Sequence, residues 1–98
     1  MNIYEVQNGN ELVLVVEGRL DTSTAPSLES KVNEIIANTE NLVFDFSKLE
    51  YISSAGLRVL LSTQKVMNKQ GKMVVKNVKP EIMEVFEITG FVDILTIE

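Results

Sequence analysis

The sequence predicts an α/β domain built on a single mixed five-stranded sheet, in the element order ββαβαβαβ. Three observations predict it. Two strand-like segments at the N-terminus are separated by Asn8-Gly9-Asn10, and short apolar runs then alternate with segments of helical periodicity. No linker, repeat or low-complexity tract interrupts the 98 residues, so we expect one domain over residues 1–98.

The first two strands should form an antiparallel hairpin. Residues 3–6 alternate apolar and polar side chains, and residues 11–17 are rich in valine and leucine. Gly9 and its two asparagine neighbours tolerate the positive φ angles that tight turns need.

A first amphipathic helix is predicted over residues 25–38. Thr22-Ser23-Thr24 offers three candidate N-caps, and Pro26 is tolerated in the first turn of a helix. Four apolar side chains fall on one face of this helix, namely Leu28, Val32, Ile35 and Ile36.

A buried strand over residues 42–46 precedes a second helix. Ser54 fits the N-cap of that helix, because a hydroxyl there can accept from the free amides of the first turn. The helix should stop at Gln70, where Gly71 can adopt the left-handed conformation that often ends helices.

The remaining elements are a strand over residues 72–77, a helix from Pro80 to Gly90 and a last strand over residues 93–97. If successive strands lie side by side, right-handed crossovers place all three helices on one face of the sheet.

Composition excludes several classes of function. The chain has no cysteine and no histidine, so thiolate chemistry and the commonest general base are both missing. Its net charge is −5, without a clustered basic patch, which argues against nucleic-acid binding. The absence of a long apolar run or a signal-like N-terminus predicts a cytoplasmic protein without direct membrane insertion.

The chemistry should lie at the carboxyl edge of the parallel strands, where the predicted loops 20–23, 52–55 and 78–80 meet. A serine nucleophile there would have only Asp21 and Lys79 as neighbours, which form no recognisable triad. Neither GxxxxGK[ST] nor GxGxxG is present, so the sequence does not indicate an intrinsic phosphate cradle for a nucleotide. A hydrolytic or nucleotide-binding domain is the weakest of the hypotheses.

Ser54 has two interpretations. It can be a helix cap among small residues that pack tightly, or a phosphorylated serine at the positive end of a helix. Asp21 is either a turn residue that accepts from loop amides or a partner contact. Arg58 is either an ordinary surface charge or a group that pairs with a phosphate or an acidic partner.

Two segments of the sequence favour the interpretation of Ser54 as a phosphorylated serine. Tyr51-Ile52-Ser53-Ser54-Ala55-Gly56-Leu57, together with Glu17-Gly18-Arg19-Leu20-Asp21-Thr22, resembles the signature of the STAS family of bacterial anti-sigma-factor antagonists. In that family the serine directly before a small residue and Gly-Leu is phosphorylated, which corresponds to Ser54. Family members often carry Asp where this chain has Ser53, so both hydroxyls are candidates.

The resemblance implies a binding protein that catalyses nothing and needs no cofactor. Its unphosphorylated form would bind an anti-sigma factor with serine kinase activity and release the sigma factor. Phosphorylation of Ser54 would break the complex, and a PPM-type phosphatase would restore it. The expected partner-binding residues are Asp21, Thr22, Ser53, Ser54, Gly56 and Arg58. The alternative is a STAS adaptor subunit of a stress-signalling complex or a membrane transporter.

Overall fold

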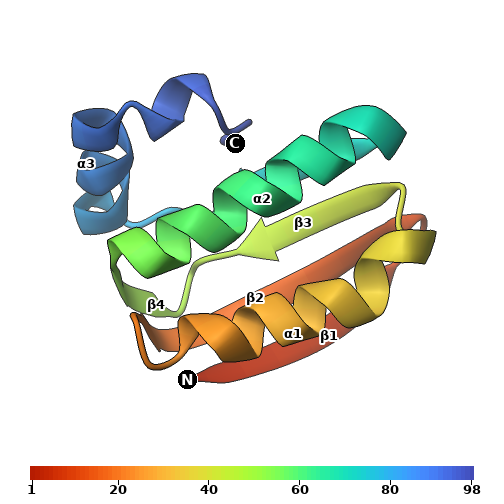
Figure 1. The fold of residues 1–98 in the computed structure, drawn as a ribbon, viewed down its shortest axis with the longest axis horizontal. Helices are drawn as coiled ribbons and strands as arrows, with labels where there is room; N and C mark the ends of the chain where they lie inside the picture. The colour runs from red at the N-terminus through yellow and green to blue at the C-terminus, as the bar shows by residue number, and fades with distance from the viewer.

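The computed structural model describes all 98 residues (Figure 1). In chain order the strands and helices are β1 (Asn2–Asn8), β2 (Glu11–Leu20), α1 (Ala25–Ile35), β3 (Asn41–Asp45), β4 (Leu49–Ile52), α2 (Ser54–Gln70), β5 (Lys72–Lys76) and α3 (Pro80–Thr89). Short 3₁₀ turns follow α1 at Ile36–Asn38 and α3 at Phe91–Asp93.

The sheet is organised around β2. Its strand order is β1-β2-β3-β5, with β1 antiparallel to β2 and the other neighbours parallel. The first part of β2, Leu12–Val15, pairs with β3, whereas its end, Gly18–Leu20, pairs with β4. One ten-residue strand therefore holds three others in register.

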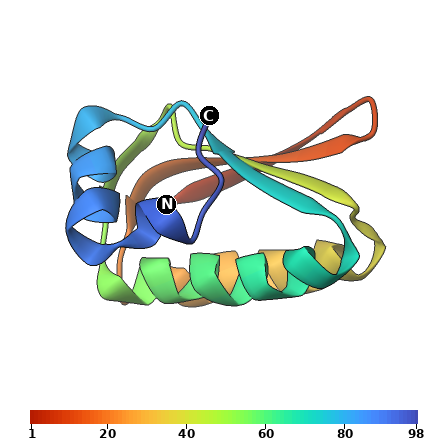
Figure 2. The same cartoon turned by 90° about the horizontal axis from the view of Figure 1, so that it is seen from above.

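Two of the three helices, α1 and α2, form a layer against one face of the sheet, so the prediction that all three lie on that face holds for these two. Figure 2 shows α1 and α2 side by side beneath one face, and α3 across the end of the sheet, while no helix covers the opposite face. The alternation along β2 explains this arrangement, because Leu12, Leu14 and Val16 are buried on the helix side. Phe44 of β3, Leu60 of α2 and Phe86 of α3 belong to the same fully buried core.

The predicted fold class is confirmed, since the sheet is mixed and five-stranded and carries three helices. The predicted strand over residues 93–97 is wrong. A 3₁₀ turn occupies Phe91–Asp93, and only a single parallel bridge, Val75 to Ile97, joins the C-terminal segment to β5. The fifth strand is β4 instead, a segment that the sequence analysis left between a strand and a helix.

The second helix ends at the predicted residue, Gln70, but Gly71 ends it for another reason. Its φ of 176° is extended backbone that any residue can adopt. A Cβ atom at this position would lie 1.9 Å from the carbonyl oxygen of Glu40, so only glycine permits the close approach of the two backbones. The left-handed residue that ends a helix is Gly90, after α3.

Candidate functional site

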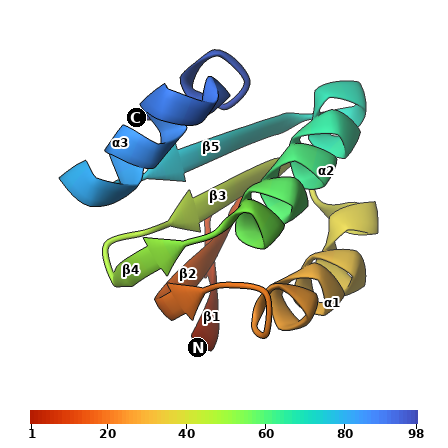
Figure 3. The same ribbon diagram turned by 60° about the vertical axis from the view of Figure 1, so that its left-hand side comes forward.

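The loops that follow β2 and β4 lie together at the carboxyl edge of the sheet. Arg19 and Leu20 pair with Tyr51 and Ile52, and the amide of Ser53 donates to the carbonyl of Leu20 at 2.9 Å. Figure 3 shows the ends of the two strands side by side, with α1 and α2 leaving from them. Two segments about thirty residues apart in the chain thus form one surface.

Asp21 organises the loop between β2 and α1. Its Oδ1 atom accepts from the Ser23 hydroxyl at 2.8 Å, from the Ser23 amide at 3.0 Å and from the Thr24 amide at 3.2 Å. The Ser23 hydroxyl is the main cause that holds the pKa of Asp21 below its usual value. Asp21 is therefore a turn residue that accepts from loop amides, which is one of the two interpretations that the sequence offered.

The two serines at the start of α2 differ in environment. Ser53 is the N-cap residue, so the prediction that Ser54 is the cap is wrong by one position. The Ser53 carbonyl accepts from the amide of Leu57 at 3.0 Å, but its hydroxyl is buried and has no hydrogen-bond partner. Ser54 is the first helical residue, and it is exposed. The structure thus leaves Ser54 as the accessible hydroxyl of the pair.

Gly56 lies beneath this surface and is buried. A Cβ atom there would come within 2.6 Å of Leu20 Cγ and 2.9 Å of Ile52 Cγ1. Gly56 therefore lets α2 approach the ends of β2 and β4, and its expected role as a partner contact is not available to a buried residue.

A shallow groove runs beside Ser54 between the first turns of α1 and α2. Its volume is about 270 Å³ and its walls are formed by Thr22, Ala25, Pro26, Glu29, Ala55, Arg58, Val59 and Ser62. Arg58 is exposed and follows Ser54 by four residues, so the two side chains share one face of α2. The groove brings Thr22 and Arg58, two of the predicted site residues, together.

Arg19 and Tyr51 lie at the same edge of the sheet as Asp21, although the sequence analysis did not single them out. The Arg19 guanidinium lies 4.2 Å from the centroid of the Tyr51 ring, and its Nε atom lies 3.8 Å from Asp21 Oδ2. Tyr51 is 40% exposed. Both residues occur in the two signature segments, but only the pairing of β2 with β4 shows that they stack.

Lys79, in the third predicted loop, precedes α3 as its N-cap residue. No side-chain hydrogen bond or ion pair joins it to Asp21 or to either serine. α3 packs against β4, so its first turn nevertheless starts near the same end of the sheet (Figure 3).

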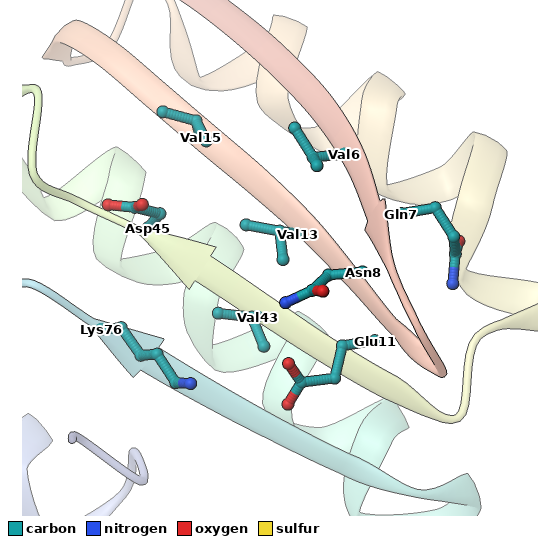
Figure 4. Close-up of a pocket in the computed structure, with 9 residues that line it drawn as sticks. All are labelled: Val6, Gln7, Asn8, Glu11, Val13, Val15, Val43, Asp45 and Lys76. Atoms are coloured by element: carbon teal, nitrogen blue, oxygen red, sulfur yellow. The ribbon is translucent and has the colours of Figure 1, made fainter.

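A second depression, of about 390 Å³, lies on the uncovered face of the sheet (Figure 4). Val6, Val13 and Val43 form its floor on three neighbouring strands, and Glu11, Asp45 and Lys76 surround them. It shares no residue with the predicted site.

No group of acidic side chains in the chain is arranged to hold a metal ion, and no helix offers an apolar stretch of the length that a bilayer crossing needs.

Comparison with known proteins identifies the family. The model of the STAS domain matches residues 2–98. The chain is 38% identical to the putative anti-sigma factor antagonist BtrV of Bordetella bronchiseptica, over 88% of this chain and 76% of that protein. It is 30% identical to the anti-sigma-B factor antagonist of Bacillus subtilis, over 99% of this chain and 90% of that protein.

A solved structure agrees with these relatives. The crystal structure of an anti-sigma factor antagonist from Mycobacterium paratuberculosis superposes with a TM-score of 0.91, at 26% identity, over 98% of this chain and 83% of that one. The fold, the two signature segments and the sequence relatives therefore agree, and the chain belongs to the STAS domain family.

Proposed function

We propose that this protein is an anti-sigma-factor antagonist whose docking to its partner is switched off by phosphorylation of Ser54. The partner is an anti-sigma factor with serine kinase activity, and a PPM-type phosphatase reverses the modification. The named relatives support the class of function, since they match 88% and 99% of the chain. The observation that carries the switch is the exposed Ser54 at the start of a 17-residue helix.

The surroundings of Ser54 favour it over Ser53 as the acceptor. A kinase must bring the γ-phosphate of ATP to the attacking hydroxyl, which requires access from solvent. Ser54 offers that access, whereas the hydroxyl of Ser53 is buried. Modification of Ser53 would require the N-terminal turn of α2 to open first.

The fold is suited to carry a phosphate at this position. The amides of the first helical turn have no partners within the helix, and the positive end of the helix dipole favours an anion. Arg58, one turn along the same face, adds a positive charge. We therefore expect phosphorylation to change the surface of the domain and to leave its backbone in place.

The effect on docking follows from charge and desolvation. A phosphate adds about −1.5 to −2 charges at pH 7 and three acceptor oxygens. A partner surface that packs against a small neutral hydroxyl must then bury that charge, at a cost of several kcal/mol. At about 1.4 kcal/mol per decade, affinity falls by about a hundredfold or more.

In this proposal the chain is a regulatory binding protein and not an enzyme. Transfer of the phosphate and its hydrolysis are catalysed by the kinase and the phosphatase, and ATP belongs to the kinase. The docking surface consists of the half-buried Asp21 and the exposed Thr22, Tyr51, Ser54 and Arg58.

The first experiment maps the modification. The chain is incubated with its cognate kinase and ATP, and the product is analysed by mass spectrometry after proteolysis. We expect one phosphate, on Ser54, and we expect Ser54→Ala to abolish it while the matched variant Ser53→Ala retains it. Phosphate on Ser53 alone would contradict the assignment, and its absence from both serines would favour the adaptor function.

The second experiment measures affinity for the kinase. Ser54→Ala should bind persistently, and Ser54→Asp should bind at least tenfold more weakly, since a single carboxylate carries less charge than a phosphate. Ser30→Asp is the control, because Ser30 is also an exposed serine but lies on α1, outside the groove beside Ser54. Equal affinities of Ser54→Ala and Ser54→Asp would refute the electrostatic switch.

A further inference from the structure

The pairing of β2 with β4 contains an irregularity that selects the neighbour of Arg19. Gly18 lies opposite Leu49 and Arg19 lies opposite Tyr51, so the register shifts by one residue and Glu50 has no partner on β2. The φ angle of Gly18 is 102°, in the region that favours glycine. Without the shift, Glu50 would lie opposite Arg19. The shift therefore places an aromatic ring beside the guanidinium in place of a carboxylate, and such irregularities often re-aim side chains next to functional sites.

Arg19 is held in place by its neighbours, although its side chain is 60% exposed. The guanidinium lies 4.2 Å from the centroid of the Tyr51 ring, within the range of a cation–π contact, and its Nε atom lies 3.8 Å from Asp21 Oδ2. The carbonyl of Arg19 accepts from the Thr24 hydroxyl at 2.8 Å. The Asp21 carboxylate is itself oriented by the hydroxyl and the amide of Ser23. An ordered loop therefore stabilises the stack of Arg19 on Tyr51.

Tyr51 is the exposed large apolar residue that lies nearest to Ser54 in the chain. Three residues span at most about 11 Å, so the Cα atoms of Tyr51 and Ser54 lie within that distance of each other. A protein interface of standard size covers about 800 Å² on each partner, which corresponds to a radius of about 16 Å. A contact of this size that is centred on Ser54 therefore reaches Tyr51.

The chemistry of Tyr51 suits an anchor of a protein interface. Tyrosine is enriched among the residues that contribute most to the affinity of such interfaces. Its ring offers a large apolar area with few rotatable bonds, and the cation–π contact with Arg19 already restrains those bonds. Little side-chain freedom is therefore lost when the ring enters a pocket of another protein.

The charges around Tyr51 indicate an apolar pocket as its complement. Arg19 and Asp21 compensate each other, so the stacked guanidinium does not enter an interface as an unpaired charge. Glu50, the neighbour of Tyr51 in the chain, is exposed, and a charge at the rim of an interface stays solvated. Burial of the ring therefore leaves no uncompensated charge without water.

We propose that Tyr51 is the anchor with which this chain docks on the serine kinase, and that an apolar pocket of the kinase receives its ring. Arg19 is a positioning residue that acts through Tyr51. This inference rests on the proposed function, because it requires a kinase that modifies Ser54. Tyr51 binds the kinase equally in the ground state and in the transition state of phosphate transfer, so it determines KM and not kcat.

Steady-state phosphorylation tests the anchor. The cognate kinase is supplied with saturating ATP, the chain is the varied substrate, and phosphate on Ser54 is quantified by mass spectrometry. Tyr51→Ala should raise KM at least about tenfold and leave kcat within about twofold of the wild-type value. Tyr51→Phe keeps the ring, so its KM should stay within about twofold of wild type.

Tyr4→Ala is the matched control. Tyr4 is also a half-exposed tyrosine with a cation near its ring, Lys48 Nζ at 5.6 Å from the centroid, but it lies on β1. Its removal should leave KM within about twofold of wild type. Circular dichroism checks that each variant is folded.

The outcomes separate this inference from the proposed function. A wild-type chain that the kinase does not phosphorylate would refute the proposed function and the anchor with it. Phosphorylation of the wild-type chain together with an unchanged KM for Tyr51→Ala would refute the anchor alone. An equal rise of KM in Tyr51→Ala and Tyr4→Ala would also refute the anchor alone.

A double-mutant cycle tests the positioning role of Arg19. Arg19→Ala should raise KM about threefold to tenfold in the wild-type chain but less than about twofold in Tyr51→Ala, because Arg19 acts through the ring. Lys48→Ala removes the cation beside Tyr4 and is the control, with a change of KM below about twofold in both backgrounds. Equal effects of Arg19→Ala in the two backgrounds would show that Arg19 contacts the kinase directly and would overturn its positioning role.

Discussion

Ser53 and Ser54 are adjacent in the chain, but the Ser53 hydroxyl is buried without a hydrogen-bond partner and the Ser54 side chain is exposed. The helix boundary between them produces this difference. Ser53 has extended dihedral angles, with ψ at 177°, and its backbone is held by Leu20 and Leu57, whereas Ser54 already belongs to the helix. Stability and accessibility can therefore be examined separately at the two positions.

Ser53→Ala should leave the free energy of unfolding unchanged or raise it by up to about 1 kcal/mol, because it removes a buried polar group that makes no hydrogen bond. Urea denaturation followed by circular dichroism measures this. The control is Thr39→Val, which removes a hydroxyl that donates to the carbonyl of Ile35 and should cost about 1 kcal/mol. If Ser53→Ala lowered the free energy of unfolding as much as Thr39→Val does, the Ser53 hydroxyl would have to make a hydrogen bond in solution.

Gly56→Ala should destabilise the fold by about 1–3 kcal/mol, although alanine is the better helix former. The added methyl group would have to displace the buried side chains of Leu20 and Ile52. Ser62→Ala is the matched control, since it changes an exposed position of the same helix and should alter stability by no more than about 0.5 kcal/mol. Thermal unfolding of both variants decides the point, and a Gly56→Ala protein as stable as the wild type would contradict the packing argument.

Asp21 should titrate below the ordinary aspartate pKa in a two-dimensional NMR experiment, because Ser23 and Thr24 donate to its carboxylate. Ser23→Ala should move that pKa back towards its usual value, since the Ser23 hydroxyl is the largest cause of the shift. A pKa at or above the usual value in the wild-type chain would refute this account of the loop.

The same carboxylate makes stability depend on pH. The unfolded chain holds the Asp21 proton at higher pH than the folded chain, so the stabilisation is complete above the ordinary aspartate pKa. It is lost as pH falls through the lower pKa of the folded state. The stability difference between wild type and Asp21→Asn should therefore shrink in acid, and a difference that stays constant with pH would contradict the linkage.

Most of the fold could be predicted because its longer elements have clear periodicity. The apolar run at residues 42–46 and the helix from Ser54 to Gln70 are long enough for the pattern of apolar residues alone to identify them. β4 could not be predicted in the same way. It has four residues, of which only Leu49 and Ile52 are buried, and it is a strand because Gly18–Leu20 offers it a partner.

The position of Ser54 in the site could be predicted, because the signature segment marks the start of a helix. The signature segment located Ser54 at the first turn of α2, but helix caps depend on the dihedral angles of one residue, and these place Ser53 at the cap. The stacking of Arg19 on Tyr51 depends on the register of β2 and β4, which no local pattern encodes.

The sharing of β2 between β3 and β4 has a consequence for the order in which the chain folds. The β1–β2 hairpin is local and can form early, whereas the pairing of Gly18–Leu20 with β4 must close a loop of about thirty residues. Ser54 acquires its neighbours only after that closure. Under the proposed function, a nascent or partly unfolded chain would present no complete target to the kinase, so a phosphate on Ser54 would mark molecules that have finished folding.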